Sequence, residues 1–196
     1  MFGLLRKRIM YIDVCIPYDE EGRLARAYNR ALADGISEWV LFLDHDVFLC
    51  NPYWYEMCME AIEKLRQDPK AACVGCECGG EHLAKEKRQQ GRDYIQPNGN
   101  IDHHIQHSKM MYHKHGNMLE QIRVSVPGYF ILLKRELARE IGFVQRKRSI
   151  NNIDTDFGGR LMKAGYHIYN MPGLYVYHRR GMKHLKKEFK IKDNET

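Results

Sequence analysis

Residues 39–48 read "WVLFLDHDVF", an apolar run followed by two acids with a histidine between them. Residues 39–43 are apolar throughout, as expected for a central strand that is covered on both faces. Asp44, His45 and Asp46 follow directly. Two carboxylates this close repel each other by on the order of a few kcal/mol where water is scarce. A divalent cation is the first candidate for the charge that would balance them.

The segments before this run have first a strand pattern and then a helix pattern. Residues 9–17 are rich in β-branched and aromatic side chains and stop at Pro17, which is typical of a buried strand. A helix is predicted next and ends at Gly35, because apolar residues recur at helical spacing: Leu24, Ala27, Tyr28, Ala31 and Leu32. The acids therefore lie at the carboxyl end of a central strand, where open α/β sheets bind ligands.

The rest of the chain continues this alternation, with one interruption. Asn51 as cap and Pro52 as first residue predict a helix through Leu65, and residues 71–78 predict a third strand. Residues from about 79 to 123 have no regular period, which predicts a long irregular insertion with one helix near residues 109–121. The later segments favour a strand and a short helix over residues 124–142, a helix ended by Gly165, and two short strands around the Pro-Gly turn of residues 167–178. The sequence thus predicts a three-layer α/β domain.

Length and charge restrict the classes of protein further. The 196 residues are expected to form a single domain, with a formal charge of +6 concentrated at the two ends and a basic tail from about residue 179 to 196. Such a tail suits phosphates, anionic lipids or nucleic acid, although most basic runs are solvated helix faces. No apolar run reaches the ~18 residues of a transmembrane segment, and no signal peptide is recognisable. Six cysteines without an export signal favour a cytoplasmic protein with reduced thiols.

Two clusters could bind zinc. The run "HHIQHSKMMYHKH", from His103 to His115, contains imidazoles at helical spacing, but no closed ligand set is evident, and a loop that faces an acceptor is the favoured interpretation. Cys73, Cys76 and Cys78 alternate along a predicted strand and contain one CxxC pair. Because no second pair completes a site, they are expected to be small buried apolar residues.

Four successive motifs resemble the GT-A type glycosyltransferases, especially their inverting family 2. They are "GRLARAYNRAL" (22–32), "LDHDV" (43–47), "VPGYFILLKRELAREIGFV" (126–144) and "IDTDFGGRLMKAGYHIYNMPGLYVYH" (153–178). The resemblance covers most of residues 10–180. It implies a Rossmann-like mixed sheet and an enzyme that moves a sugar from a nucleotide-sugar donor to an acceptor hydroxyl, with inversion.

The resemblance also implies roles for individual residues. Asp44, Asp46 and His178 would hold Mn²⁺ or Mg²⁺, and Asp154 would be the general base that takes the proton of the acceptor hydroxyl. Asp156 is the alternative base, because Ile153 stands where the family often has glutamate; the spacing to Arg160 favours Asp154. The residues expected to bind the donor are Pro17, Tyr18, Asp19, Asn29, Asp44 and His45, and those expected to bind the acceptor are Gly128, Tyr129 and Asp156.

The partners are expected to be a UDP- or GDP-sugar and an unidentified hydroxyl acceptor, which could be a glycan, a lipid-linked molecule or a modified nucleic acid. The chain lacks the strand and helix that the family usually places before the helix at residues 22–32, so the nucleotide-binding half is either abbreviated or merged with residues 11–19. Two other functions fit some of the same features. One is a basic module that binds nucleic acid, and the other is a nucleotidyltransferase with the same metal and diphosphate chemistry. In either case Asp154 and Asp156 could simply interact with a helix dipole, and His178 could have a backbone partner.

Overall fold

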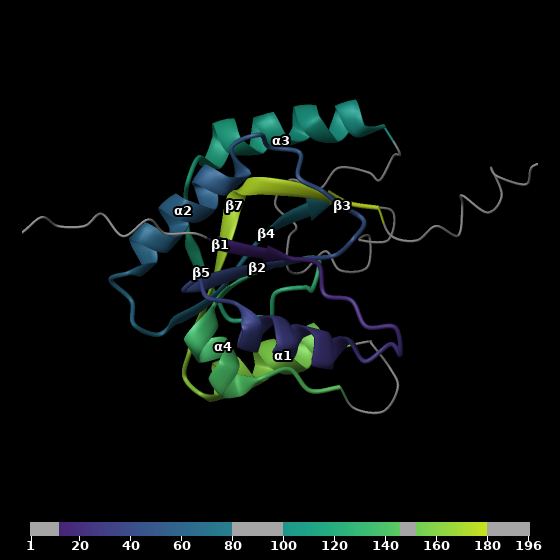
Figure 1. Cartoon of the computed structure of the whole chain (residues 1–196). Helices are drawn as coiled ribbons and strands as arrows, with labels where there is room; N and C mark the ends of the chain where they lie inside the picture. Colours follow the sequence, from purple (N-terminus) through teal and green to yellow (C-terminus); the bar gives the residue numbers. More distant parts are fainter. Residues whose placement is uncertain (1–11, 80–99, 146–151, 180–196) are drawn as a thin grey trace, which may run out of the picture.

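The computed structural model describes residues 12–79, 100–145 and 152–179, which form a seven-stranded sheet with helices on both faces (Figure 1). The strands are β1 (Ile12–Cys15), β2 (Trp39–Leu43), β3 (Val47–Phe48), β4 (Ala71–Gly79), β5 (Glu120–Ile122), β6 (Phe130–Lys134) and β7 (His167–His178). The helices are α1 (Leu24–Asp34), α2 (Trp54–Leu65), α3 (Ile101–His115), α4 (Arg135–Ile141) and α5 (Ile153–Lys163).

The strand order is β1-β2-β6-β4-β7-β3, and β5 pairs with β7 outside this path. β1 is parallel to β2, β4 is parallel to β7, and β6 runs antiparallel between β2 and β4. β1, β2, β4 and β7 therefore share one direction, and their carboxyl ends meet at one edge of a mixed sheet. This confirms the predicted α/β class and the predicted mixed sheet.

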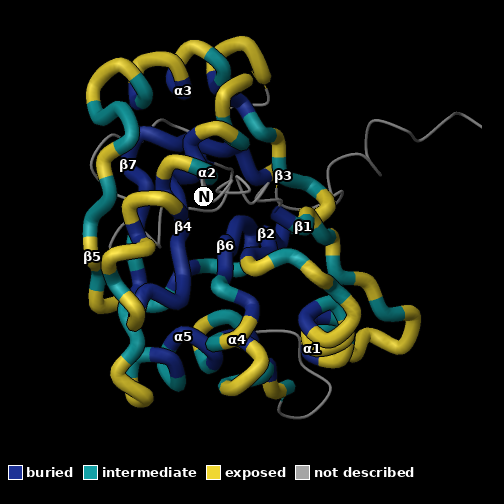
Figure 2. Tube along the Cα trace, turned by 60° about the vertical axis from the view of Figure 1, so that its left-hand side comes forward, coloured by how far each residue is buried: buried dark blue, intermediate teal, exposed yellow. Residues whose placement is uncertain are grey.

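Three layers follow from the way the two faces of the sheet are covered. One apolar cluster joins α2 to the sheet, and a second joins α1, α4 and α5 to the opposite face. All five residues of β2 are buried, with Val40, Leu41 and Phe42 fully inaccessible (Figure 2). Burying each such side chain contributes roughly 1.5–3 kcal/mol relative to exposure, which explains why β2 lies inside the sheet.

The prediction of an irregular insertion is wrong for residues 100–123, which form a helix and a strand. α3 begins at Ile101 and ends at His115, whereas a helix was expected at residues 109–121, and β5 was not predicted. Asn100 caps the helix through its Oδ1, which accepts the N–H of Asp102 at 3.0 Å, and Gly116 ends it with a φ of 54°. Residues 80–99 lie outside the described part of the chain.

β7 is also different from the prediction of two short strands around a turn. It is one strand that bends near its middle (Figure 1). The register against β4 jumps from Cys76 opposite Met171 to Glu77 opposite Tyr175, so residues 172–174 form a wide irregularity. The Pro-Gly pair interrupts the ladder without reversing the chain, because proline and glycine suit bulges as well as turns.

The helix α2 begins at Trp54, two residues later than expected. Asn51 still contributes at this end, because its Oδ1 accepts the N–H of Tyr53 at 2.9 Å. Within the described ranges, no helix has the length and apolar character needed to cross a membrane. The basic tail beyond Arg179 lies outside those ranges, and the extent of the single domain stays a prediction.

Candidate active site

The acids of residues 44–46 are fixed by backbone contacts at the end of β2. The N–H of Asp44 donates to the carbonyl of Tyr129 at 3.2 Å, and the chain then turns through a bond from Val47 N–H to the Asp44 carbonyl at 3.3 Å. Val47 pairs with His178 in the antiparallel ladder of β3 and β7. This pairing brings Asp46 next to His178, which lies 132 residues further along the chain.

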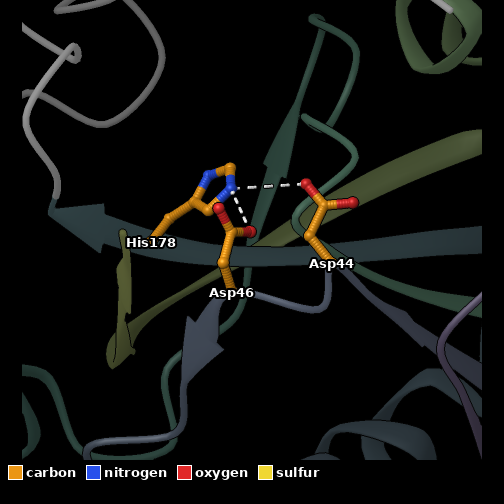
Figure 3. A group of neighbouring side chains, drawn as sticks. All are labelled: Asp44, Asp46 and His178. Atoms are coloured by element: carbon orange, nitrogen blue, oxygen red, sulfur yellow. Dashed lines mark hydrogen bonds and ion pairs between the residues drawn. The ribbon is translucent and has the colours of Figure 1, made fainter. Parts of the chain in front are cut away.

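Three side chains meet at this point (Figure 3). His178 Nε2 lies 3.0 Å from Asp46 Oδ1 and 3.5 Å from Asp44 Oδ2. One ligand atom from each of the three residues lies within 4.8 Å of the others. The His178 side chain is 8% exposed and that of Asp44 is 36% exposed, so the histidine closes the group from inside while the carboxylates reach the surface. Two carboxylates and one imidazole fit a divalent cation and leave positions for further oxygen ligands.

Within this group, the surroundings of Asp44 shift the pKa of its carboxyl. Burial raises the pKa of its carboxyl; His178 lowers it, and the neighbouring negative charges of Asp46 and Asp154 raise it. The net direction is upward. An environment that opposes the charged carboxylate in this way is the one in which a bound cation would be favourable.

Asp154 lies in the first turn of α5 and is held by two backbone donors. Its Oδ2 accepts the N–H of Gly128 at 2.7 Å, and its Oδ1 accepts the N–H of Thr155 at 2.8 Å. Gly128 directly precedes Tyr129, whose carbonyl holds Asp44. Two consecutive residues before β6 therefore hold the backbone of Asp44 and the carboxylate of Asp154, which explains how the two aspartates come near each other.

Asp156, the alternative base, is occupied differently. Its Oδ2 accepts a hydrogen bond from Arg160 Nε at 2.7 Å, and Arg160 also donates to the carbonyl of Ile141 at 2.6 Å. Asp156 is therefore an ion-pair partner within α5 and supports the contact of this helix with the end of α4.

The predicted acceptor residues Gly128 and Tyr129 hold Asp154 and Asp44 in place through their backbone groups. The Tyr129 side chain is 1% exposed, and its hydroxyl donates to the carbonyl of Cys76 at 3.1 Å. Its ring centroid lies 5.6 Å from that of His178. The Tyr129 side chain is therefore packed in the interior, and its contact with an acceptor stays a prediction.

The predicted donor residues separate into two groups. Asp19 and Asn29 bind other parts of the chain: Asp19 Oδ2 accepts from Arg26 Nε at 2.8 Å, and the Asn29 amide bonds both the N–H and the carbonyl of Phe143. Both therefore hold α1 in place. Pro17 and Tyr18, in contrast, line an open groove of about 420 Å³ between the end of β1 and α1. His45 is exposed in the turn between the two acids.

The histidine and cysteine clusters have structural contacts. His104 is fully buried and stacks on Tyr177 with centroids 3.8 Å apart, and His107 meets Tyr175 edge-on. All six cysteines are free thiols, and those of β4 are buried. Across residues 12–79, 100–145 and 152–179, Asp44, Asp46 and His178 form the only group of three that could hold a metal, so neither predicted zinc alternative is supported there.

One side chain near the site was predicted only as part of a helix stripe. The Tyr28 phenol is close enough to Asp44 and Asp154 for both charges to raise its pKa, in addition to the larger effect of burial. Its hydroxyl at an otherwise apolar position was the only signal in the sequence.

A mixed α/β sheet with an Asp-x-Asp pair and a histidine at its carboxyl edge is the arrangement expected of a GT-A type glycosyltransferase. The sequence profile of Glycosyl transferase family 2 matches residues 5–142, and the chain belongs to this family. No curated protein matches the chain significantly. Among solved structures, the chain is similar to the mannosyltransferase PcManGT from Pyrobaculum calidifontis in complex with GDP-Man and Mn²⁺, with 17% identity and a TM-score of 0.49. The match covers 81% of this chain but only 37% of that chain.

Proposed function

We propose that this chain transfers a sugar from a nucleotide-sugar donor to an acceptor hydroxyl, with a divalent metal and with inversion at the anomeric carbon. The observation that carries this proposal is the convergence of Asp44, Asp46 and His178, with Asp154 nearby, in a member of glycosyl transferase family 2.

The metal ion, Mn²⁺ or Mg²⁺, would be held by Asp44, Asp46 and His178. When bound, it supplies positive charge that stabilises the departing diphosphate. The three side chains orient the diphosphate at the carboxyl edge of the sheet. Pro17 and Tyr18 line the groove at the same end of β1, which supports a role of these two residues in holding the nucleotide.

Asp154 would act as the general base. An alcohol is a weak nucleophile until its proton is removed, and a positioned carboxylate can accept that proton in the transition state. The N–H donors of Gly128 and Thr155 orient the Asp154 carboxylate. Asp156 is less suited to this role, because Arg160 already engages its carboxylate. A single displacement by the activated hydroxyl accounts for inversion.

The test is a screen of UDP- and GDP-sugars with Mn²⁺ for release of a nucleoside diphosphate. We expect Asp46→Ala to lose metal-dependent donor binding. Asp154→Asn should bind the donor as the wild type does but turn over about 10²- to 10⁴-fold more slowly, the usual contribution of general base catalysis. Glu63→Gln, an exposed carboxylate on α2, serves as the matched control.

Full activity in both site variants would refute the assignment. Release of pyrophosphate in place of a nucleoside diphosphate would identify a nucleotidyltransferase instead. Binding to nucleic acid that weakens steeply with salt and needs no metal would favour the basic binding module. The cytoplasmic location expected from the sequence stays a prediction.

A further inference from the structure

Tyr28, on the inner face of α1, is a nearly buried residue that the proposed function leaves without a role. Its side chain is 4% exposed. Its ring meets Phe42 edge-on with centroids 4.7 Å apart and stacks on Phe143 at 4.3 Å. Two aromatic contacts of this kind fix the ring, so packing sets the position of the hydroxyl.

The contact with Phe42 places Tyr28 against β2, the strand that precedes Asp44 and Asp46 of the candidate metal group. Phe42 belongs to β2, and Asp44 directly follows the end of this strand, where its N–H still donates to the carbonyl of Tyr129. Side chains two residues apart along a strand leave the same face of the sheet. Tyr28 and Asp44 therefore lie on the α1 side of the sheet.

The contact with Phe143 connects Tyr28 to α5, the helix that carries the proposed base Asp154. Phe143 stacks in turn on Phe157 with centroids 4.0 Å apart. Phe157 follows Asp154 by three residues in α5, and residues at this spacing are neighbours on one side of a helix. The Tyr28 ring is thus held between the elements that carry Asp44 and Asp154.

The chemistry of this position makes the phenol a hydrogen-bond donor. Burial raises the pKa of Tyr28, and the charges of Asp44 and Asp154 raise it further, so the hydroxyl keeps its proton at neutral pH. Among the residues that the structure describes, the Tyr28 hydroxyl has no hydrogen-bond partner. This hydroxyl oxygen is also not among the enclosed side-chain atoms that lack a partner, so it is accessible and its proton is available to a ligand.

We propose that Tyr28 is a substrate-binding residue whose hydroxyl donates a hydrogen bond to an oxygen of the transferred sugar, in the space between Asp44 and Asp154. This inference rests on the proposed function. In that function, the diphosphate lies beside Asp44, Asp46 and His178, and the acceptor hydroxyl lies beside Asp154. The sugar that passes from one to the other must occupy the space between them.

Tyr28→Phe tests this assignment, because it keeps the ring contacts and removes only the hydroxyl. The readouts are Mn²⁺-dependent hydrolysis of the UDP- or GDP-sugar that the wild type uses best and the affinity for UDP or GDP alone. We expect kcat/KM to fall about 3- to 10-fold, the effect of one lost hydrogen bond, while the affinity for the nucleoside diphosphate changes less than about twofold.

Tyr166→Phe is the matched control. It removes a phenol that donates to Glu140 at 2.6 Å, and Tyr166 follows the end of α5 opposite to Asp154. We expect wild-type kinetics for this variant. An unchanged kcat/KM in Tyr28→Phe would overturn the inference, and so would an equal loss of affinity for the nucleoside diphosphate alone, because the contact would then be to the diphosphate. Absence of Mn²⁺-dependent binding of UDP and GDP in the wild type would instead refute the proposed function itself.

Discussion

At the scale of single residues, the candidate site is electrostatically unfavourable until a cation binds. Asp44 is partly buried and lies beside Asp46 and Asp154, and its raised pKa reflects the free energy required to keep it charged in the folded state. His178 offsets part of this repulsion through its contacts with Asp44 and Asp46. The charged Asp44 carboxylate therefore reduces the stability of the metal-free protein at neutral pH.

Asp44→Asn is expected to stabilise the metal-free protein. A carboxyl whose pKa is higher in the folded state than its unfolded value of ~3.9 favours folding below that value and loses this contribution as the pH rises through the folded pKa. In EDTA at pH 7, the melting temperature should therefore rise, by no more than the ~2–4 °C that ~1 kcal/mol represents for a domain of this size, because the side chain is 36% exposed and water screens part of the repulsion.

The gain should shrink as the pH is lowered toward ~4, where the wild-type carboxyl is increasingly protonated in both states. Asp34→Asn, which changes an exposed carboxylate paired with Arg30, should leave the melting temperature unchanged. Thermal melts followed by circular dichroism at several pH values measure both effects. A variant less stable than the wild type in EDTA at pH 7 would contradict this account.

The Asp44 and Asp46 pair is predictable from its place after an apolar strand, whereas Asp154 and His178 are expected only from the resemblance to family 2. The structure brings Asp44, Asp46 and His178 together. The sequence does not predict that Asn29 binds the backbone of Phe143, or that the Tyr129 hydroxyl bonds the carbonyl of Cys76. These partners are 114 and 53 residues away along the chain, so only the folded packing determines them.

At the scale of elements, the site depends on how closely α5 approaches the segment before β6. Gly158 lies against Ser125, so a Cβ at this position would be 2.9 Å from the Cα of Ser125. The next residue, Gly159, has open space where its Cβ would be. Position 158 therefore has no room for a side chain, whereas position 159 of the same helix does.

Gly158→Ala is expected to destabilise the protein by about 1–3 kcal/mol, the usual cost of overpacking, and to move α5 away from the segment that holds Asp154 through Gly128. Gly159→Ala should be neutral or stabilising by up to ~1 kcal/mol, because alanine favours the helix. Urea denaturation measures both. Equal stability of the two variants would show that α5 and the segment are not in close contact.

Helices with an apolar stripe were predictable from local pattern, but α3 and the bend of β7 were not. His104 and His107 have the composition of a polar loop, yet they pack against Tyr175 and Tyr177 of β7. The stabilising partners of α3 lie about 70 residues further along the chain, which is why the helical period alone placed it incorrectly.

At the scale of the whole molecule, the amino edge of the sheet carries stabilising contacts and the carboxyl edge carries the candidate site. At the amino edge, Arg135 is 4% exposed; it forms an ion pair with Asp13 and donates to the carbonyls of Ser37 and Ala31. These contacts join α1, β1 and the start of α4. The side chains of the candidate site lie at the opposite, carboxyl edge, so Arg135 stabilises the fold without occupying the space where ligands would bind.

We propose above that Asp44, Asp46 and His178 bind a divalent metal together with a nucleoside diphosphate. The most direct test is titration of the full chain with Mn²⁺, followed by electron paramagnetic resonance of the free ion, with and without UDP or GDP. We expect the wild type and Glu63→Gln to bind one Mn²⁺ per chain, more tightly with the nucleotide, and Asp46→Ala to bind it at least about 10-fold more weakly. Equal Mn²⁺ binding by Asp46→Ala and the wild type, or no binding by the wild type, would contradict the claim.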